Sequence, residues 1–197
     1  MNIKCVLFDF DGTLTRPGAL DFPAIKQELG CPADQAILEY LETQPAARRS
    51  ALMKILEEIE DQAAEASHPN KGAEICILEL KKRGILLGIL TRNSLSSVKK
   101  ALQKFEGVVI HDFAAVITRE MSLPKPHPDG VRKAARQMGI STKEILLAGD
   151  FRFDIIAGKT AGAKTVLLTN GERAVMLPGD PEPDFVVYNL KEILDIL

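Results

Sequence analysis

The sequence predicts an α/β fold built on a parallel sheet, with a helical segment inserted near its amino-terminal end. Short apolar runs bounded by turn residues alternate with stretches of helical periodicity. One long stretch, residues 22–69, has helical periodicity and no strand signal. Alternation of this kind is typical of right-handed βαβ units, whose sheet is covered by helices on both faces.

Six short runs rich in Val, Ile or Leu are the predicted strands. Each is bounded by turn or polar residues, and the first ends in Asp-Gly. Runs of this length and composition are typical of strands buried in a parallel sheet. The predicted strands are Lys4–Phe10, Ile85–Leu90, Ala114–Ile117, Ile145–Ala148, Thr165–Leu168 and Phe185–Val187.

Helical spacing fills most of the intervals between these runs. The predicted helices are Ala73–Arg83, Leu95–Phe105 and Val131–Met138. Gly84 and Gly139 follow the first and the third of them, at the position where a glycine commonly ends a helix.

Residues 22–69 are predicted to be a small helical domain inserted into a sheet domain that comprises residues 1–21 and 70–197. Turn-forming residues typical of linkers flank the insertion at Pro17-Gly18 and at His68–Gly72. Inside it, apolar residues at i, i+3, i+4 and i+7 indicate one buried helix face. They are Leu52, Ile55, Leu56 and Ile59. We expect the neighbouring acidic residues, Glu57, Glu58, Glu60 and Asp61, to form a solvated face.

Composition sets the broad class. A chain of 197 residues that is 46% hydrophobic can bury one good core. Cys5, Cys31 and Cys76 are widely spaced among apolar residues, so we expect buried thiols. No apolar run reaches the ~18 residues of a membrane span, which predicts a cytoplasmic protein with no membrane contact. The net charge of -2 argues against an extended basic surface for nucleic acid, but does not exclude a small anionic substrate.

The strongest local signal for chemistry is the segment from Asp9 to Thr13, which reads Asp-Phe-Asp-Gly-Thr. Ligands of open parallel sheets bind at the carboxyl ends of the strands, so Asp9 would project into a crevice. Gly12 would let the backbone turn closely around an anion, whose oxygens could accept hydrogen bonds from the turn amides. An ordinary strand end with an Asx turn is the alternative for this string alone.

Other strand ends supply the context. Thr91 ends the second predicted strand, and its hydroxyl could donate a hydrogen bond to a phosphoryl oxygen, although a turn threonine is common there. The neighbouring Arg92 is a candidate for contact with phosphate or carboxylate, or for an ion pair with an acidic residue of the insertion. Lys125 lies between Pro124 and Pro126, which restrict the backbone and could aim its ammonium at a fixed point.

A second pair of carboxylates, Asp150 and Asp154, follows the fourth predicted strand. Asp154 could simply cap the next helix. Two pairs of carboxylates in one crevice would repel each other unless a cation neutralised them. Hard oxygen ligands of this kind favour Mg²⁺, so we predict a magnesium site.

Taken together, these residues resemble the four signature motifs of the haloacid dehalogenase superfamily. Residues 9–14 look like its first motif, Thr91 its second, Lys125 its third, and Asp150 with Asp154 its fourth. The insertion stands where members of the phosphoglycolate phosphatase and β-phosphoglucomutase type carry a helical cap. The resemblance therefore implies a Rossmann-like sheet domain with a helical cap.

The resemblance also implies a Mg²⁺-dependent phosphatase that hydrolyses a small phosphomonoester, such as phosphoglycolate or a sugar phosphate. Asp9 would be the nucleophile and Asp11 the general acid and base. Gly12, Thr91, Arg92 and Lys125 would bind phosphate. Asp9, the carbonyl of Asp11 and Asp150 would bind the metal, while Asp154 would bind it through water or orient Lys125.

Two departures from the family pattern concern the substrate contacts: Phe151 replaces a small hydroxyl residue, and Arg92 separates Thr91 from Asn93. A phosphomutase of the β-phosphoglucomutase type and a catalytically idle binding protein with the same fold remain alternatives. A dehalogenase of this family would need no second aspartate, so the presence of Asp11 argues against carbon–halogen cleavage. A phosphonate hydrolase would need a cap lysine, for which only Lys26 and Lys54 stand in suitable places. The expected partner is a small phosphorylated metabolite, and the expected assembly is a monomer or a homodimer.

Overall fold

The computed structural model describes residues 2–172 and 176–197 and contains one six-stranded sheet. All neighbouring strands are parallel, in the order β3-β2-β1-β4-β5-β6. The strands are β1 Cys5–Phe8, β2 Leu86–Leu90, β3 Ala115–Ile117, β4 Ile145–Gly149, β5 Lys164–Leu168 and β6 Phe185–Val187. The predicted fold class is thus confirmed, and each of the six predicted runs overlaps a strand.

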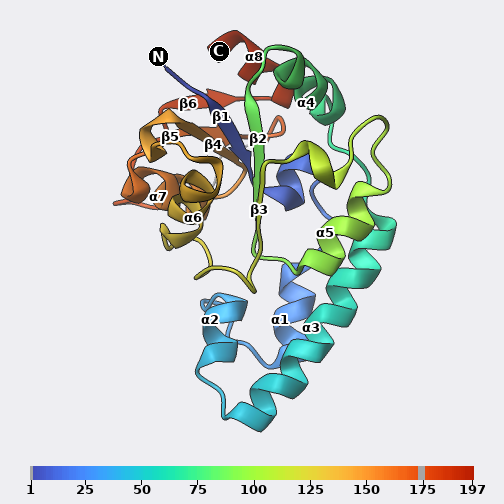
Figure 1. The fold of residues 1–197 in the computed structure, drawn as a ribbon. Coiled ribbons are helices and arrows are strands. Elements are labelled where there is room, and N and C mark those ends of the chain that lie inside the picture. Colours follow the sequence, from blue (N-terminus) through green and yellow to red (C-terminus); the bar gives the residue numbers. More distant parts are fainter. Residues whose placement is uncertain (1, 173–175) are drawn as a thin grey trace.

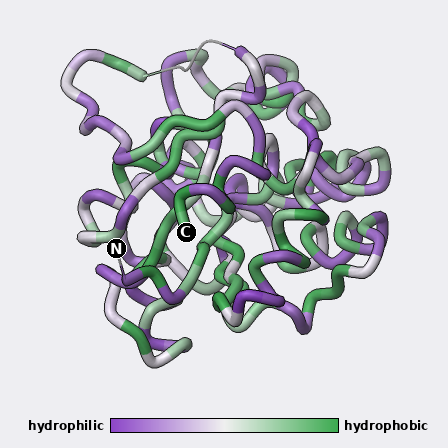
Figure 2. The backbone as a smooth tube through the Cα atoms, turned by 90° about the horizontal axis from the view of Figure 1, so that it is seen from above, coloured by the Kyte–Doolittle hydropathy of each residue, from purple (hydrophilic) through white to green (hydrophobic). Residues whose placement is uncertain are grey.

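Helices cover both faces of the sheet, as Figure 1 shows. One face packs against α4 Ala73–Lys82, α5 Leu95–Leu102 and α8 Ile193–Ile196, and the other packs against α6 Asp129–Met138 and α7 Arg152–Ala161. Side chains of β1 alternate between the two clusters, because successive residues of a strand point to opposite faces. In Figure 2 the flanking helices alternate between hydrophobic and hydrophilic stretches, as helices with one buried face do.

The first predicted strand is shorter than expected. It ends at Phe8, although the amide of Asp9 still donates to the carbonyl oxygen of Ala148 at 2.8 Å. The chain then turns over Phe10–Leu14, where the backbone of Asp11 and Gly12 is not helical. This turn brings Asp11 back toward the end of the strand instead of continuing it.

The insertion consists of α1 Phe22–Leu29, α2 Ile37–Glu42 and α3 Ala46–Ala66, which lie beyond the carboxyl ends of the strands (Figure 1). It has its own apolar cluster, which includes Leu29, Leu41 and Leu56. Its two linkers run side by side, because Thr15 and Pro69 form an antiparallel bridge and the amide of Arg16 donates to the carbonyl of His68 at 3.0 Å.

The prediction that the acidic run is a solvated face is wrong for one of its four residues, Glu60. The side chain of Glu60 is only 5% exposed and pairs with Arg119 at 2.5 Å. Asp61 pairs with Lys100 at 2.9 Å and accepts a hydrogen bond from the Ser97 hydroxyl. The cause is that α3 packs this side against α5 and the loop after β3, which supply cations from far along the chain.

The three cysteines are buried free thiols, as predicted. Among the described residues, no helix combines the length and the apolar character that crossing a bilayer requires.

Candidate active site

The loops that follow β1, β3 and β4 converge on the carboxylate of Asp9. Its Oδ1 lies 2.5 Å from Nζ of Lys125, whose side chain is only 2% exposed. The same ammonium lies 2.6 Å from Oδ1 of Asp154, which is equally buried. An ammonium so deeply buried is stable as a charged group only because two carboxylates face it.

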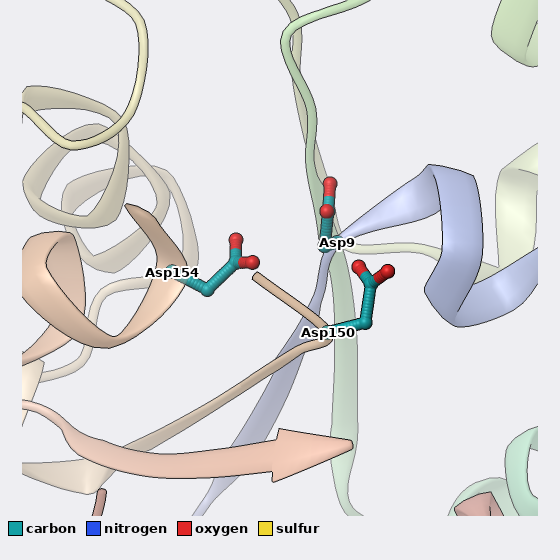
Figure 3. Close-up of side chains that lie close together, drawn as sticks. All are labelled: Asp9, Asp150 and Asp154. Atoms are coloured by element: carbon teal, nitrogen blue, oxygen red, sulfur yellow. The ribbon is translucent and has the colours of Figure 1, made fainter. Parts of the chain in front are cut away.

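Asp150 completes a group of three carboxylates. One oxygen from each of Asp9, Asp150 and Asp154 lies within 4.8 Å of the others. Figure 3 shows that these side chains come from the end of β1, the end of β4 and the start of α7, and that Asp154 reaches toward Asp9. Asp150 accepts a hydrogen bond from the hydroxyl of Thr13 at 3.2 Å.

Glycine is required at position 12 for two reasons. Its φ of +72° is a conformation that other residues rarely adopt. A Cβ at this position would also lie 2.1 Å from Oδ2 of Asp150. The close approach that the sequence predicted for Gly12 is thus made, in this structure, to a carboxylate of the site.

Two asparagines hold the turn that carries Asp11. The side-chain amide of Asn170 donates to the carbonyl of Gly12 at 2.7 Å, and that of Asn70 donates to the carbonyl of Thr13 at 2.8 Å. Asn70 also donates to Oδ1 of Asn170 at 2.9 Å. Because Asn70 stands in the second linker of the insertion, it connects that linker directly to the turn.

Asp11 is oriented by the loop after β2. The side-chain amide of Asn93 donates to Oδ2 of Asp11. The backbone amide of Asn93 donates to the hydroxyl oxygen of Thr91 at 3.1 Å. Thr91 is only 3% exposed, and within residues 2–172 and 176–197 its hydroxyl accepts a hydrogen bond but donates none. The site therefore holds Asp11 by a neutral donor and Asp9 by a cation.

Burial and mutual repulsion raise the pKa values of three carboxyls. Burial, followed by the charge of Asp154, raises the pKa of Asp9 to about 6, although Lys125 opposes the rise. Burial and then the charge of Asp9 raise the pKa of Asp150 to about 8. Burial, Asp9 and Glu60 raise the pKa of Asp11 to about 7, and Asn93 opposes this. The site thus holds more negative charge than its own cation balances.

A divalent cation fits these residues. Three carboxylates face one ammonium, and that ammonium contacts Asp9 and Asp154 and not Asp150. All the donors are hard oxygens, which suit Mg²⁺. Both oxygens of Asp154 already have partners, since Oδ2 accepts from the amide of Phe151 at 3.2 Å. In the described part of the chain Asp9 uses Oδ1 for Lys125 and Asp150 uses Oδ1 for Thr13, so the second oxygens of these two carboxylates are the donors that a cation could take.

Arg92 forms an ion pair with an acidic residue of the insertion, which is one of the two roles that the sequence allowed. Its guanidinium forms a bidentate pair with Glu39 of α2, at 2.5 and 2.9 Å. It also donates to the carbonyl of Lys125 and stacks over the ring of Phe153 at 5.2 Å. Burial by itself would raise the pKa of Glu39, but the hydrogen bonds and charge of Arg92 hold it below its ordinary value.

The structure thus brings together Asp9, Asp11, Gly12, Lys125 and Asp150, with Asp154 beside them. Sequence reasoning missed the orienting partners: Asn93, Thr13, Asn70 and Asn170. A polar residue two positions after Thr91 was a visible signal for Asn93. Asn70 and Asn170 are 100 residues apart, and their pairing leaves no local pattern.

A buried lysine and a cluster of carboxylates lie at the carboxyl edge of a parallel sheet that helices cover on both faces, and together they define an α/β protein with an acidic site at that edge. A model of the haloacid dehalogenase-like hydrolase family matches residues 6–168. The chain belongs to this family, and the predicted resemblance and enzyme class, a hydrolase, are confirmed.

Known proteins resemble the chain over its whole length. It is 31% identical over 199 residues to an uncharacterized hydrolase of Saccharomyces cerevisiae, with 100% of this chain and 91% of the yeast protein covered. It is 33% identical over 219 residues to the putative pyrophosphatase PpaX of Clostridium perfringens, covering 99% and 97%. The crystal structure of a predicted phosphoglycolate phosphatase from Haemophilus somnus superimposes with a TM-score of 0.74 at 20% identity, covering 100% and 98%.

Proposed function

We propose that the protein is a Mg²⁺-dependent phosphatase that hydrolyses a small phosphomonoester through a phosphoryl group carried transiently on Asp9. The observation that carries the proposal is the carboxylate of Asp9 at the end of a central strand, 2.5 Å from the buried ammonium of Lys125. Family membership and the relative named a putative pyrophosphatase support phosphoryl transfer as the chemistry.

Asp9 would attack phosphorus, forming an acyl phosphate and releasing the leaving oxygen of the ester. Asp11, held by Asn93, would give that oxygen a proton. Asp11 would then take a proton from water as the water attacks phosphorus, and this step would release phosphate and restore the carboxylate of Asp9. A single side chain can serve both half-reactions because the first leaves it in the form that the second requires.

Charge is the main obstacle, because an anionic nucleophile must approach an anionic phosphate. Lys125, positioned by Asp154, would stabilise the equatorial oxygens, and the hydroxyl of Thr91 would donate to one of them. Asp9, Asp150 and the carbonyl of Asp11 would hold Mg²⁺, which supplies positive charge to the phosphoryl oxygens when bound. In this proposal Gly12 contributes the close turn, and Arg92 is not a phosphate ligand.

Residues 22–69 would act as a cap over this site. Two observations support a separate unit here: an apolar cluster of its own and linkers that run side by side. Closing such a cap would shield the site from bulk water, leaving room for the attacking water molecule, and would strengthen the electrostatic contacts.

The test is phosphate release from p-nitrophenyl phosphate with and without Mg²⁺. We expect release that stops with a chelator and returns when Mg²⁺ is restored, and no release from Asp9→Asn. A matched control is Asp129→Asn, a carboxylate of α6 that pairs with Lys133 on the same helix. Full activity of Asp9→Asn, or release that does not depend on a divalent cation, would contradict the proposal.

Pyrophosphate is a second candidate substrate, because the Clostridium perfringens relative, aligned over 97% of its length, is named a putative pyrophosphatase. Comparing kcat/KM for pyrophosphate with kcat/KM for a series of alkyl and sugar phosphates would decide between them.

A further inference from the structure

The ion pair between Arg92 and Glu39 connects the insertion to the loop that follows β2, beside the candidate site. Arg92 follows Thr91 at the end of β2, and Glu39 lies in α2 of the insertion. Both oxygens of Glu39 accept from the guanidinium. The Arg92 side chain is 21% exposed, so solvent screens the pair only in part.

The guanidinium is held close to the reacting centre. It donates to the carbonyl of Lys125, the residue whose ammonium contacts Asp9. The ring of Phe153, the neighbour of Asp154, lies 5.2 Å from it. One residue, Lys125, thus contacts the guanidinium through its backbone carbonyl and the carboxylate of Asp9 through its ammonium. A small phosphorylated molecule bound at Asp9 would have to extend over about the length of one lysine side chain to place its far end at Arg92.

We propose that Glu39 is a specificity-determining residue, which occupies Arg92 and so directs the site toward phosphomonoesters whose remaining part carries no second anion. A guanidinium at this place would otherwise bind a carboxylate or a second phosphate bidentately. Because both terminal nitrogens of the Arg92 guanidinium donate to Glu39, an anionic substrate group must first displace this charge-assisted pair. It would also meet the negative charge of Glu39 itself.

This inference rests on the proposed phosphatase function and narrows its substrate class. It ranks esters of uncharged alcohols above phosphoglycolate-like esters and above pyrophosphate. It also accounts for the departure at this position, where Arg92 separates Thr91 from Asn93.

The experiment compares two substrates of nearly equal size, 2-hydroxyethyl phosphate and phosphoglycolate, which differ in a carboxylate. We expect wild type to prefer 2-hydroxyethyl phosphate in kcat/KM. In Glu39→Gln, Arg92 is freed to bind the carboxylate, and the ratio of the two kcat/KM values should shift toward phosphoglycolate by about tenfold, the effect of one charge-assisted hydrogen bond.

The control is Glu42→Gln, which removes the same charge from the same helix. Glu42 is 71% exposed and pairs with Arg49 inside the insertion, so its loss should leave the ratio unchanged. In the double variant Glu39→Gln with Arg92→Met, the shift should disappear, because no guanidinium remains to bind the carboxylate. Melting temperatures would verify that each variant is folded.

Three results would overturn the inference: an unchanged ratio in a folded, active Glu39→Gln; an equal shift in Glu42→Gln; or a shift that persists without Arg92. A folded Glu39→Gln that is inactive on both esters would also overturn it, since Glu39 would then be needed for turnover in general. Failure of the proposed function looks different, because wild type would release no phosphate from either ester.

Discussion

The interiors of the sheet domain and of the helical insertion are apolar, whereas ion pairs connect the two parts. Apolar clusters fill both faces of the sheet, and a third cluster fills the interior of α1, α2 and α3. Across the boundary, three sets of ion pairs connect the two parts: Arg92 with Glu39, Arg119 with Glu60, and Lys100 with Asp61. Ala64, near the end of α3, is the residue of the insertion that belongs to a sheet cluster.

This difference has a physical consequence. Apolar clusters lose their stabilisation when they are exposed to water, whereas the partly exposed pairs Arg92–Glu39 and Lys100–Asp61 exchange their partners for water at small cost. The pair Arg119–Glu60 is buried and costs more to break. If residues 22–69 act as a cap, as proposed, opening it would break these ion pairs and leave the three apolar clusters intact. An enzyme whose site lies at such a boundary can admit a substrate without unfolding any of its core.

The largest expected effect is at Asp11, where the two parts meet. Asp11 is held by Asn93 of the sheet domain, and the charge of Glu60 on α3 acts on it. Asp11→Asn should lower kcat/KM by about 10²–10⁴-fold for an alkyl phosphate, the range for loss of a general acid or base. The loss should be smaller for p-nitrophenyl phosphate, whose leaving group needs no proton.

Steady-state kinetics with both esters measure this difference. Asp112→Asn is a suitable control, because Asp112 forms its ion pair with Lys81. An equal loss of kcat/KM for both esters would show that Asp11 does not act on the leaving group, because kcat/KM does not include the later attack of water on the acyl phosphate.

The second prediction concerns the buried pair at the boundary. The side chains of Arg119 and Glu60 are 7% and 5% exposed. Arg119→Met would leave the Glu60 carboxylate buried without its cation, which typically costs about 3–5 kcal/mol of unfolding free energy. The double variant with Glu60→Met should recover most of this loss, since no buried charge remains.

Urea denaturation of the two single variants and the double variant forms a complete cycle. A double variant as unstable as the sum of the singles would show that the two side chains do not act as a pair. The contact between the sheet domain and the insertion would then not depend on its most buried ion pair.

A smaller effect is expected at a polar contact within the sheet domain. Burial alone would raise the pKa of Asp184, but hydrogen bonds from Lys159, Lys164 and the amide of Thr165 hold it well below its usual range. Because the folded-state pKa is depressed, Asp184 contributes stability above its unfolded pKa of about 3.9, and this contribution is lost as pH falls below that value.

Asp184→Asn should therefore lower the free energy of unfolding by about 1–3 kcal/mol at pH 7, the value of hydrogen bonds to a charged group, and by less at pH 3. Urea denaturation of wild type and variant at the two pH values measures the difference. A deficit that is the same at both would mean that the ionised carboxylate is not what these donors stabilise.

The sequence predicted the elements of the sheet domain well, because its strands are short apolar runs with turn residues at both ends. It also predicted which side chains follow those strands, and therefore which ones meet at the carboxyl edge of the sheet. Asp9, Lys125 and Asp150 lie together for this reason. Their chemical roles stay predictions, as does the division at residues 22 and 69.

What the sequence could not predict is the polar contact between distant segments. Glu60 and Asp61 follow the pattern of a solvated helix face, and nothing near them indicates Arg119 or Lys100. In the same way, Arg92 was a candidate for two partners, and only the position of α2 selects Glu39. Such pairings depend on how the helices pack against the sheet, which local periodicity does not encode.

The most direct test of the central claim is to trap the phosphoryl group on Asp9. The enzyme would be quenched with acid during turnover of p-nitrophenyl phosphate in Mg²⁺ and then treated with borohydride, which reduces an acyl phosphate to an alcohol. Mass spectrometry of the peptide that contains residues 4–16 should locate the reduced side chain at position 9. Reduction at Asp11, Asp150 or Asp154 instead, or an active enzyme that leaves no reduced carboxyl, would contradict a covalent role for Asp9.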